Sequence, residues 1–87
     1  MVEEPLIEFP CKFPIKMMGR DTPNFRIAAK NLIESHVGPI TDDAIEVNLS
    51  SNANFVSVTI TIIAKSQQQL DDIYRDASGH DDVLIAL

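Results

Sequence analysis

The order of hydrophobic patterns along this chain predicts an α+β sandwich, in which two helices cover one face of a four-stranded antiparallel sheet. Alternating apolar residues predict four strands, and a helical spacing of apolar residues predicts two helices. The predicted order is strand, helix, strand, strand, helix, strand. Because 87 residues hold one core, we expect a single domain over residues 9–87, preceded by a flexible tail over residues 1–8.

The first strand is predicted at residues 11–18. Its inward-facing residues are Cys11, Phe13, Ile15 and Met17. Pro10 and Pro14 cannot donate a ladder hydrogen bond, so we expect the start of this strand to be irregular or unpaired.

The first helix is predicted at residues 23–37. Thr22 followed by Pro23 is typical of a helix start, because a hydroxyl caps free amides and proline lacks an N–H that has no partner there. Gly38 followed by proline ends the helix. Its buried stripe is Phe25, Ala28, Ala29, Leu32 and Ile33.

Two alternating segments, residues 44–50 and 55–64, predict a hairpin whose polar loop is residues 51–54. The inward residues are Ile45, Val47 and Leu49 in the first segment and Val56, Val58, Ile60 and Ile62 in the second. The outward residues Ser57, Thr59 and Thr61 leave one polar, open sheet face.

Ser66 and Gln69 form a predicted capping box for the second helix, which ends at Gly79. Its apolar stripe is Leu70, Ile73, Tyr74 and Ala77. Residues 83–87 are predicted as the last strand. The expected core is Phe13, Ile15, Phe25, Leu32, Val47, Val58, Ile60, Leu70, Ile73 and Ile85.

The formal net charge of −6 argues against a nucleic-acid partner, because phosphate binding needs clustered lysine and arginine. The bases concentrate in the first 41 residues, as Lys12, Lys16, Arg20, Arg26 and Lys30. No apolar stretch approaches the ~20 residues of a membrane span. The single Cys11 fits a reducing cytosol, so we expect a cytoplasmic protein.

No complete catalytic or metal motif occurs in the sequence, so we expect neither an enzyme nor a cofactor. Gly79-His80-Asp81-Asp82 lacks the spaced ligand set of a metal site and is interpreted as a solvated turn. Cys11 is interpreted as a small apolar core residue. His36 is expected at the carboxyl end of the first helix, where a cation interacts favourably with free carbonyls.

The segment Gly19-Arg20-Asp21-Thr22-Pro23, together with the element order, resembles the ACT domain, a regulatory module that often binds amino acids or oligomerises. That resemblance implies a sensor of an amino acid or small anion at Gly19, Asp21 and Pro23. Asn24 stands where such domains commonly carry a second glycine, and a structural turn at Gly19 is the alternative interpretation. An acylphosphatase-like enzyme, with Arg20 binding phosphate, is a third hypothesis.

Several separate segments resemble the YbeD family of small bacterial cytosolic proteins. They are Glu8-Phe9-Pro10, Phe13, Lys16, Met18-Gly19, Ser50-Ser51, Asn54, Ser57-Val58-Thr59-Ile60-Thr61-Ile62 and Ile73-Tyr74. The resemblance implies a ferredoxin-like, ACT-like sandwich without an established activity. It also suggests a pathway link to lipoate metabolism, because genes of that family often lie near one for octanoyl transfer.

The sequence therefore predicts a non-catalytic regulatory or protein-interaction module, a monomer or weak homodimer. Its partner is expected to be a protein with an acidic surface or a small anionic or amino-acid ligand. The candidate site residues are Lys12, Lys16, Gly19, Arg20, Asp21, Pro23, Ser57, Thr59 and Thr61. RNA recognition would need two or three stacking aromatics on the open face, where only Phe55 is expected. A solvated sheet without a partner is the competing interpretation.

Overall fold

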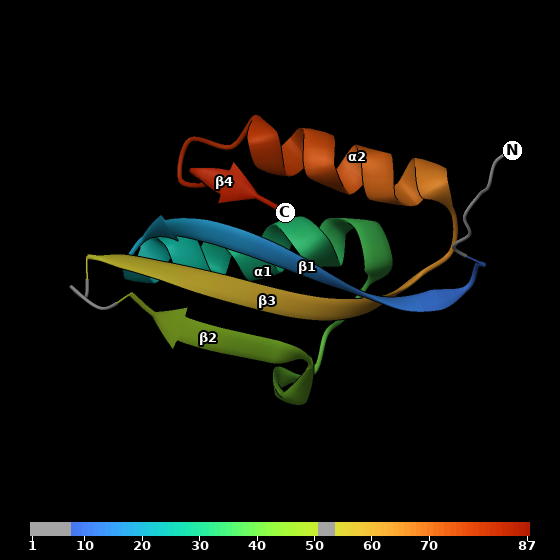
Figure 1. The fold of residues 1–87 in the computed structure, drawn as a ribbon, viewed down its shortest axis with the longest axis horizontal. Coiled ribbons are helices and arrows are strands. Elements are labelled where there is room, and N and C mark those ends of the chain that lie inside the picture. Colours follow the sequence, from blue (N-terminus) through green and yellow to red (C-terminus); the bar gives the residue numbers. More distant parts are fainter. Residues whose placement is uncertain (1–7, 51–53) are drawn as a thin grey trace, which may run out of the picture.

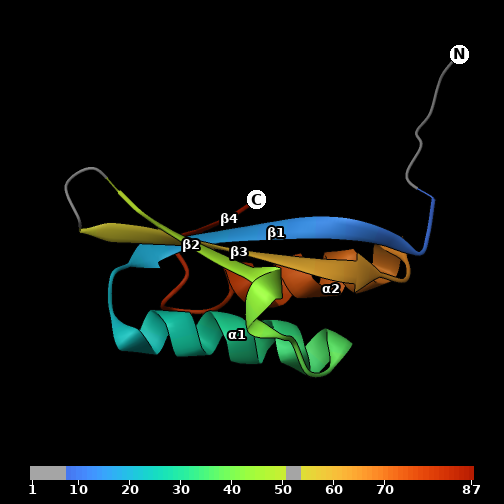
Figure 2. The same cartoon turned by 90° about the horizontal axis from the view of Figure 1, so that it is seen from below.

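A computed structural model describes residues 8–50 and 54–87. The elements are β1 (Cys11–Arg20), α1 (Pro23–Val37), a 3₁₀ turn (Asp42–Ala44), β2 (Ile45–Leu49), β3 (Phe55–Ala64), α2 (Gln67–Ser78) and β4 (Ile85–Ala86). The strands form one antiparallel sheet in the order β2-β3-β1-β4 (Figure 1). Both helices lie on one side of it (Figure 2). The predicted ferredoxin-like α+β sandwich is confirmed. Most of the predicted tail and of the hairpin loop lies outside the described residues.

β1 and β3 form the central pair of the sheet. They pair over ten residues each, from Cys11 opposite Ala64 to Arg20 opposite Phe55. The predicted inward residues of both strands face the helices, where Ile15, Met17 and Ile60 are completely buried. Alternation of period two therefore gave the correct face for every residue of this pair.

The start of β1 is regular where it meets β3, so the prediction of an irregular start is wrong on that side. Lys16 exchanges backbone bonds with Leu87, which means that even-numbered β1 residues direct their backbone groups toward β4. β4 pairs only with Met17 and Met18. Pro14 thus has its missing N–H on a stretch of edge that no described strand covers, where proline is tolerated.

The caps explain why both helices begin and end where the sequence predicts. The Thr22 hydroxyl accepts a hydrogen bond from the Phe25 amide at 3.1 Å, and Gly38 adopts a φ of 86°, which favours glycine. In α2 the Ser66 hydroxyl accepts from the Gln69 amide at 3.1 Å. The Gln69 side chain accepts from the Lys65 amide at 2.8 Å, one residue earlier than in a standard capping box.

The hydrophobic core lies between the sheet and the two helices. Its buried members are Ile15, Met17, Phe25, Ala29, Ile33, Val56, Val58, Ile60, Ile62, Ala64, Leu70, Ile73, Ala77 and Val83. Cys11 is half-buried against this cluster, as an apolar filler would be. Most of the predicted core is confirmed.

The edge strands depart from the predicted core. Val47 and Leu49 face the helical side but are 40% and 59% exposed, because the helices pack against β3, β1 and β4 and leave β2 uncovered. Ile85 is 49% exposed because it pairs with Met18, which places it on the opposite face of the sheet. Val83 and Ala86 contact the core instead. The last strand also has only two residues, fewer than the predicted five.

The buried position of Ile60 gives a direct test of this core. We expect Ile60→Ala to lower the free energy of unfolding by about 2–5 kcal/mol, because a buried cavity is left behind. Ile63→Ala is the control in the same strand, since Ile63 is 53% exposed, and it should cost less than about 1 kcal/mol. Chemical denaturation of both variants measures the difference, and equal costs would contradict the assigned faces.

Candidate functional site

The sheet has one face without a helix on it, which we call the open face. The pairing register directs to it the side chains Lys12, Pro14, Lys16, Met18 and Arg20 of β1, Glu46 and Asn48 of β2, Phe55, Ser57, Thr59, Thr61 and Ile63 of β3, and Ile85 of β4. The rigid β1–β3 pair holds most of them. Six of the nine residues that the sequence proposes for a site share this face: Lys12, Lys16, Arg20, Ser57, Thr59 and Thr61.

Lys12 and Lys16 are exposed on the open face. Lys16 lies directly opposite Thr59, and Thr61 lies opposite Pro14, between the two lysines along the sheet. The ion pairs within the described part of the chain join Asp21 to Arg26, His36 to Asp76, and Asp72 to Arg75. Both lysine amines of the open face are therefore without an acidic partner among the described residues.

Ser57 faces the open side, as predicted, but is only 8% exposed. Its neighbours across the sheet are Met18 and Asn48, which flank it on both sides. Ser57 therefore presents little surface to a partner, whereas Thr61 is exposed and Thr59 is half-buried.

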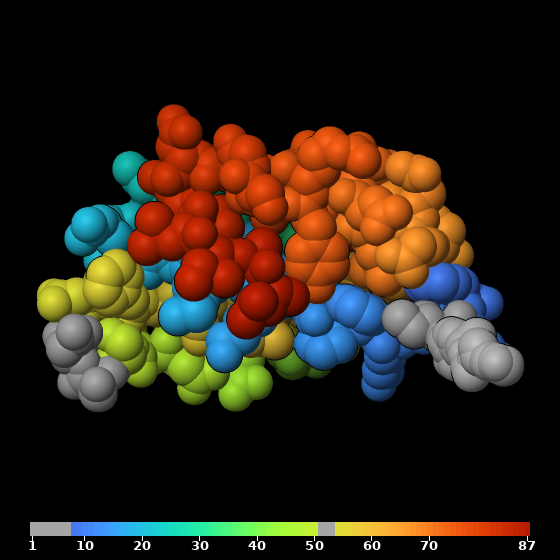
Figure 3. All heavy atoms as spheres, turned by 45° about the horizontal axis from the view of Figure 1, so that its top comes forward, coloured from blue at the N-terminus to red at the C-terminus, as the bar shows by residue number. Residues whose placement is uncertain are grey.

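Exposed aliphatic side chains border the lysines, and the sequence pattern did not identify them as site residues. Ile63 is 53% exposed opposite Lys12. At the other border, Ile85 is 49% exposed and Leu87, whose backbone pairs with Lys16, is 63% exposed. Figure 3 shows this carboxyl-terminal segment (red) against β1 and the end of α2. The sequence signal for Ile85 and Leu87 was the short apolar run at residues 83–87. Because all five of its residues are apolar, alternation cannot show which of them face the core and which face the open side.

The segment from Gly19 to Pro23 is arranged differently from the predicted ligand loop. Gly19 is a buried β1 residue opposite Val56 and is not part of a turn. A Cβ at this position would lie 2.6 Å from both the Asp82 carbonyl oxygen and a ring carbon of Phe25. The glycine is required because these groups pack directly on its Cα, so the interpretation of Gly19 as a structural turn is wrong.

The connection from β1 to α1 consists of Asp21 and Thr22, and both make local contacts. The Asp21 carboxylate pairs with Arg26 at 2.9 Å, and Thr22 caps the helix. The Arg20 guanidinium lies 5.6 Å from the centroid of the Phe55 ring, a cation–π distance. Pro23 occupies the first position of α1. The predicted residues of this segment therefore stabilise the helix start and the end of the strand pair.

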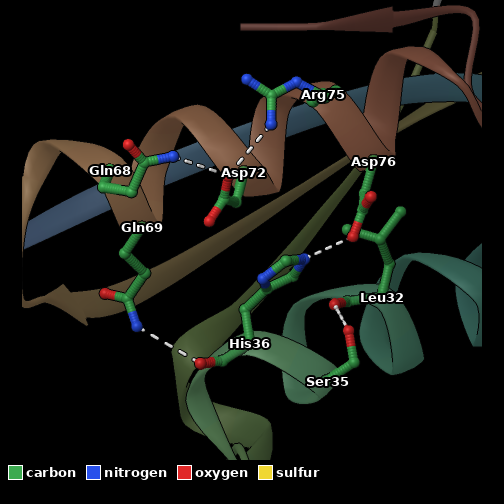
Figure 4. A network of polar contacts seen from close by, with 8 residues as sticks. All are labelled: Leu32, Ser35, His36, Gln68, Gln69, Asp72, Arg75 and Asp76. Carbon is green, nitrogen blue, oxygen red and sulfur yellow. Dashed lines mark hydrogen bonds and ion pairs between the residues drawn. The ribbon is translucent and has the colours of Figure 1, made fainter.

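A polar network joins the two helices (Figure 4). His36, in the last turn of α1 as expected, contacts the Asp76 carboxylate of α2 at 2.5 Å. The Gln69 side chain donates to the His36 carbonyl at 3.2 Å. Beside this network is an open hollow of about 640 Å³, lined in part by Ile27, Leu32 and His80. The histidines and Asp76 around it are engaged in structural contacts.

Among the titratable groups of the described residues, a clear pKa shift occurs at Tyr74 and Asp43. Burial raises the pKa of the Tyr74 hydroxyl, and hydrogen bonds from the Thr41 side chain and its own backbone lower the pKa of the Asp43 carboxyl. Both shifts lead away from neutral pH, whereas catalytic groups are moved toward it. His80 Nδ1 accepts a hydrogen bond from the Asp82 amide at 3.1 Å and so belongs to a local turn.

No cluster of three or more histidine, cysteine or acidic residues suited to a metal ion occurs in the described part of the chain. Within the same part, no helix has the length and apolar character needed to cross a membrane.

The fold is a small ferredoxin-like α+β sandwich in which one face of the sheet is uncovered. The chain belongs to the family described as "Protein of unknown function (DUF493)", which matches residues 4–87. The YbeD-like resemblance is thereby confirmed, and the family carries no catalytic name.

Bacterial relatives match over nearly the whole chain. A UPF0250 protein of Paraburkholderia phymatum is 41% identical, with 99% of this chain and 97% of the relative covered. A UPF0250 protein of Nitrosomonas europaea is 38% identical over the full length of both chains. The solution structure of protein HP0495 from H. pylori is similar with a TM-score of 0.70 at 22% identity, covering 98% of this chain and 89% of that one. That likeness shows the fold.

The packing at Gly19 predicts a specific stability defect. Gly19→Ala should lower the free energy of unfolding by about 1–3 kcal/mol, because the added methyl overlaps the Asp82 carbonyl and the Phe25 ring. Gly79→Ala is the matched control, since its nearest neighbour would be the Arg75 carbonyl oxygen at 3.5 Å and its φ is −89°. The control should change stability by less than about 1 kcal/mol. A neutral Gly19→Ala in denaturant titration would argue against a packing role.

Proposed function

We propose that this protein is a non-catalytic interaction module that binds an acidic, partly apolar surface of a partner protein through its open face. One observation carries the proposal: the amines of Lys12 and Lys16, which have no acidic partner among residues 8–50 and 54–87, lie on an uncovered sheet between the exposed aliphatic side chains of Ile63 and Leu87. The chain as a whole has a charge of −6, so this basic patch contrasts with the rest of the molecule.

The chemistry of this surface favours a protein partner. Burying exposed aliphatic side chains against a partner is favourable, and the polar border of an interface selects the partner by charge. Carboxylates of a partner would give Lys12 and Lys16 the acidic partners that the described part of the chain does not supply. Thr59 and Thr61 lie between or beside the lysines and offer hydroxyls at the same level of the sheet.

The alternatives receive less support. An amino-acid or anion sensor at Gly19, Asp21 and Pro23 would use the open hollow of about 460 Å³ at the helix start, which Asp21, Pro23, Arg26 and Ile27 line. In that hollow the Asp21 carboxylate is already paired with Arg26, and packing against Phe25 and Asp82 fills the space at Gly19. The hollow beside Ser57 on the sheet has a volume of about 80 Å³, below the roughly 300 Å³ of small ligand pockets. A regulatory role, a link to lipoate metabolism and a cytoplasmic location stay predictions from the sequence.

The proposal predicts that reversal of the two lysine charges weakens partner binding. The double variant Lys12→Glu with Lys16→Glu should bind at least about tenfold more weakly, and added salt should weaken binding of the unmodified protein in the same way. Its free energy of unfolding should change by less than about 0.5 kcal/mol per site, because both side chains are exposed. The matched control is Lys30→Glu with Arg75→Glu, which makes the same charge change on the helical layer.

Partners captured from the native cell with the unmodified protein are identified by mass spectrometry. Each is then titrated as a purified protein against the three forms. Binding that is insensitive to salt and equal for all three forms would place the interaction elsewhere, with the acidic side of α2 around Asp71 and Asp72 as the first surface to test.

A separate prediction concerns catalysis. Purified protein should not hydrolyse acetyl phosphate above the rate of buffer, because the Arg20 guanidinium lies over the Phe55 ring and the β1–α1 connection is too short to surround a phosphate. Hydrolysis that follows the protein through purification and disappears in Arg20→Ala would support the acylphosphatase-like hypothesis instead.

A further inference from the structure

The outer edge of β2 carries unsatisfied backbone groups. The Ser50 amide donates to the Phe55 carbonyl at 2.9 Å, so the even-numbered residues of this segment bond to β3. Ile45, Val47 and Leu49 therefore direct their backbone groups away from β3. The Ile45 amide is satisfied by the Asp42 carbonyl of the 3₁₀ turn. Val47 and Leu49 thus offer both N–H and C=O at an edge that no described strand covers.

This edge lacks the usual protection against pairing. Exposed edges are normally blocked by proline, lysine or a bulge. The other outer stretch of the sheet follows that rule, since β1 has Lys12 and Pro14 where β4 ends. β2 contains neither proline nor lysine, its one charged residue is Glu46, and its side chains Val47 and Leu49 are exposed on the helical side. In Figure 1 β2 runs along the margin of the sheet away from α2.

We propose that β2 pairs antiparallel with β2 of a second copy about a two-fold axis at Val47. In that register Val47 exchanges both backbone bonds with its counterpart, and each Leu49 N–H meets an Ile45 carbonyl of the other copy. The two four-stranded sheets then continue into one, and the free groups of both edges are satisfied together.

The side chains of β2 match themselves in this register, which selects a second copy as the occupant. Ile45 faces Leu49 and Val47 faces Val47 on the helical side, so the exposed aliphatic groups of both copies cover each other. On the open side Glu46 faces Asn48, and no like charges are opposed. A two-residue shift toward the amino end would oppose the two Glu46 carboxylates. The opposite shift would carry Ile45 past the end of β2 in the partner.

Sedimentation equilibrium of the purified chain tests the pairing. Over a roughly hundredfold concentration range, the mass should rise from the 9.6 kDa monomer toward twice that value. Val47→Pro removes an N–H that points away from β3, so the β2–β3 ladder stays intact while pairing is blocked. Leu49→Lys places a charge on the aliphatic seam. Both variants should remain monomeric, whereas Ile27→Lys, the same charge change at a 58% exposed residue of α1, should associate like the unmodified protein.

Amide hydrogen exchange locates the contact. The Val47 and Leu49 amides should become protected as concentration rises, while the Ser57 and Thr59 amides of the folded β3 serve as a folding reference in each variant. If Val47→Pro fails this reference, Leu49→Lys decides alone. A chain that stays monomeric over the whole range, or a dimer that survives Leu49→Lys, would overturn the proposal. Protection of these amides only on adding another protein would assign the edge to that partner and overturn it as well.

Discussion

The antiparallel pairing of β1 with β3 is the constraint on which the rest of this structure depends. Its register buries Ile15, Met17 and Ile60 under the helices, and the same register necessarily directs Lys16 and Thr59 to the other side. A slip of one residue would exchange the two faces, placing lysine in the core and isoleucine in water. The open face is thus a consequence of the same hydrophobic pattern that stabilises the fold.

Close packing at Gly19 connects β1 with the start of α1 and with the segment before β4, which is distant in sequence. Phe25 of α1 and the carbonyl of Asp82 approach the Cα of this β1 residue, so the start of the helix and the approach to β4 are positioned by the absence of a side chain. A glycine at ACT-like spacing therefore serves packing in this chain. The resemblance gave the correct topology, but the role of the glycine depends on what surrounds it.

The uncovered face and the free β2 edge are separate surfaces, and they suit different kinds of contact. The open face combines lysine amines with aliphatic borders, whereas the β2 edge offers backbone groups beside the aliphatic side chains of Val47 and Leu49. In a sheet extended through β2, the two-fold axis would be perpendicular to the sheet, so both open faces would lie on the same side. A partner with two suitable surfaces would then bind with a local-concentration advantage that a single copy lacks.

The sequence by itself determined the order of the elements, the limits of α1 and β3, and the face of each residue in β1 and β3. These features depend on local periodicity and capping, such as Thr22 and Gly38, which act within a few residues. The sequence also predicted that Lys12, Lys16, Thr59 and Thr61 share one face. Alternation gives the face of each residue, and the fold class makes the two strands neighbours.

Only the tertiary structure decided which inward residues are covered. Val47 and Leu49 have the correct parity but no helix above them, and Ile85 faces outward because Ala86, not Ile85, lies opposite Met17. The contact of His36 with Asp76 joins residues 40 positions apart, and the aliphatic border of the open face is formed by Ile63 of β3 and by Leu87, which follows β4. Coverage and long-range contacts depend on the lateral position of the helices and on the register of a two-residue strand, neither of which a local pattern encodes.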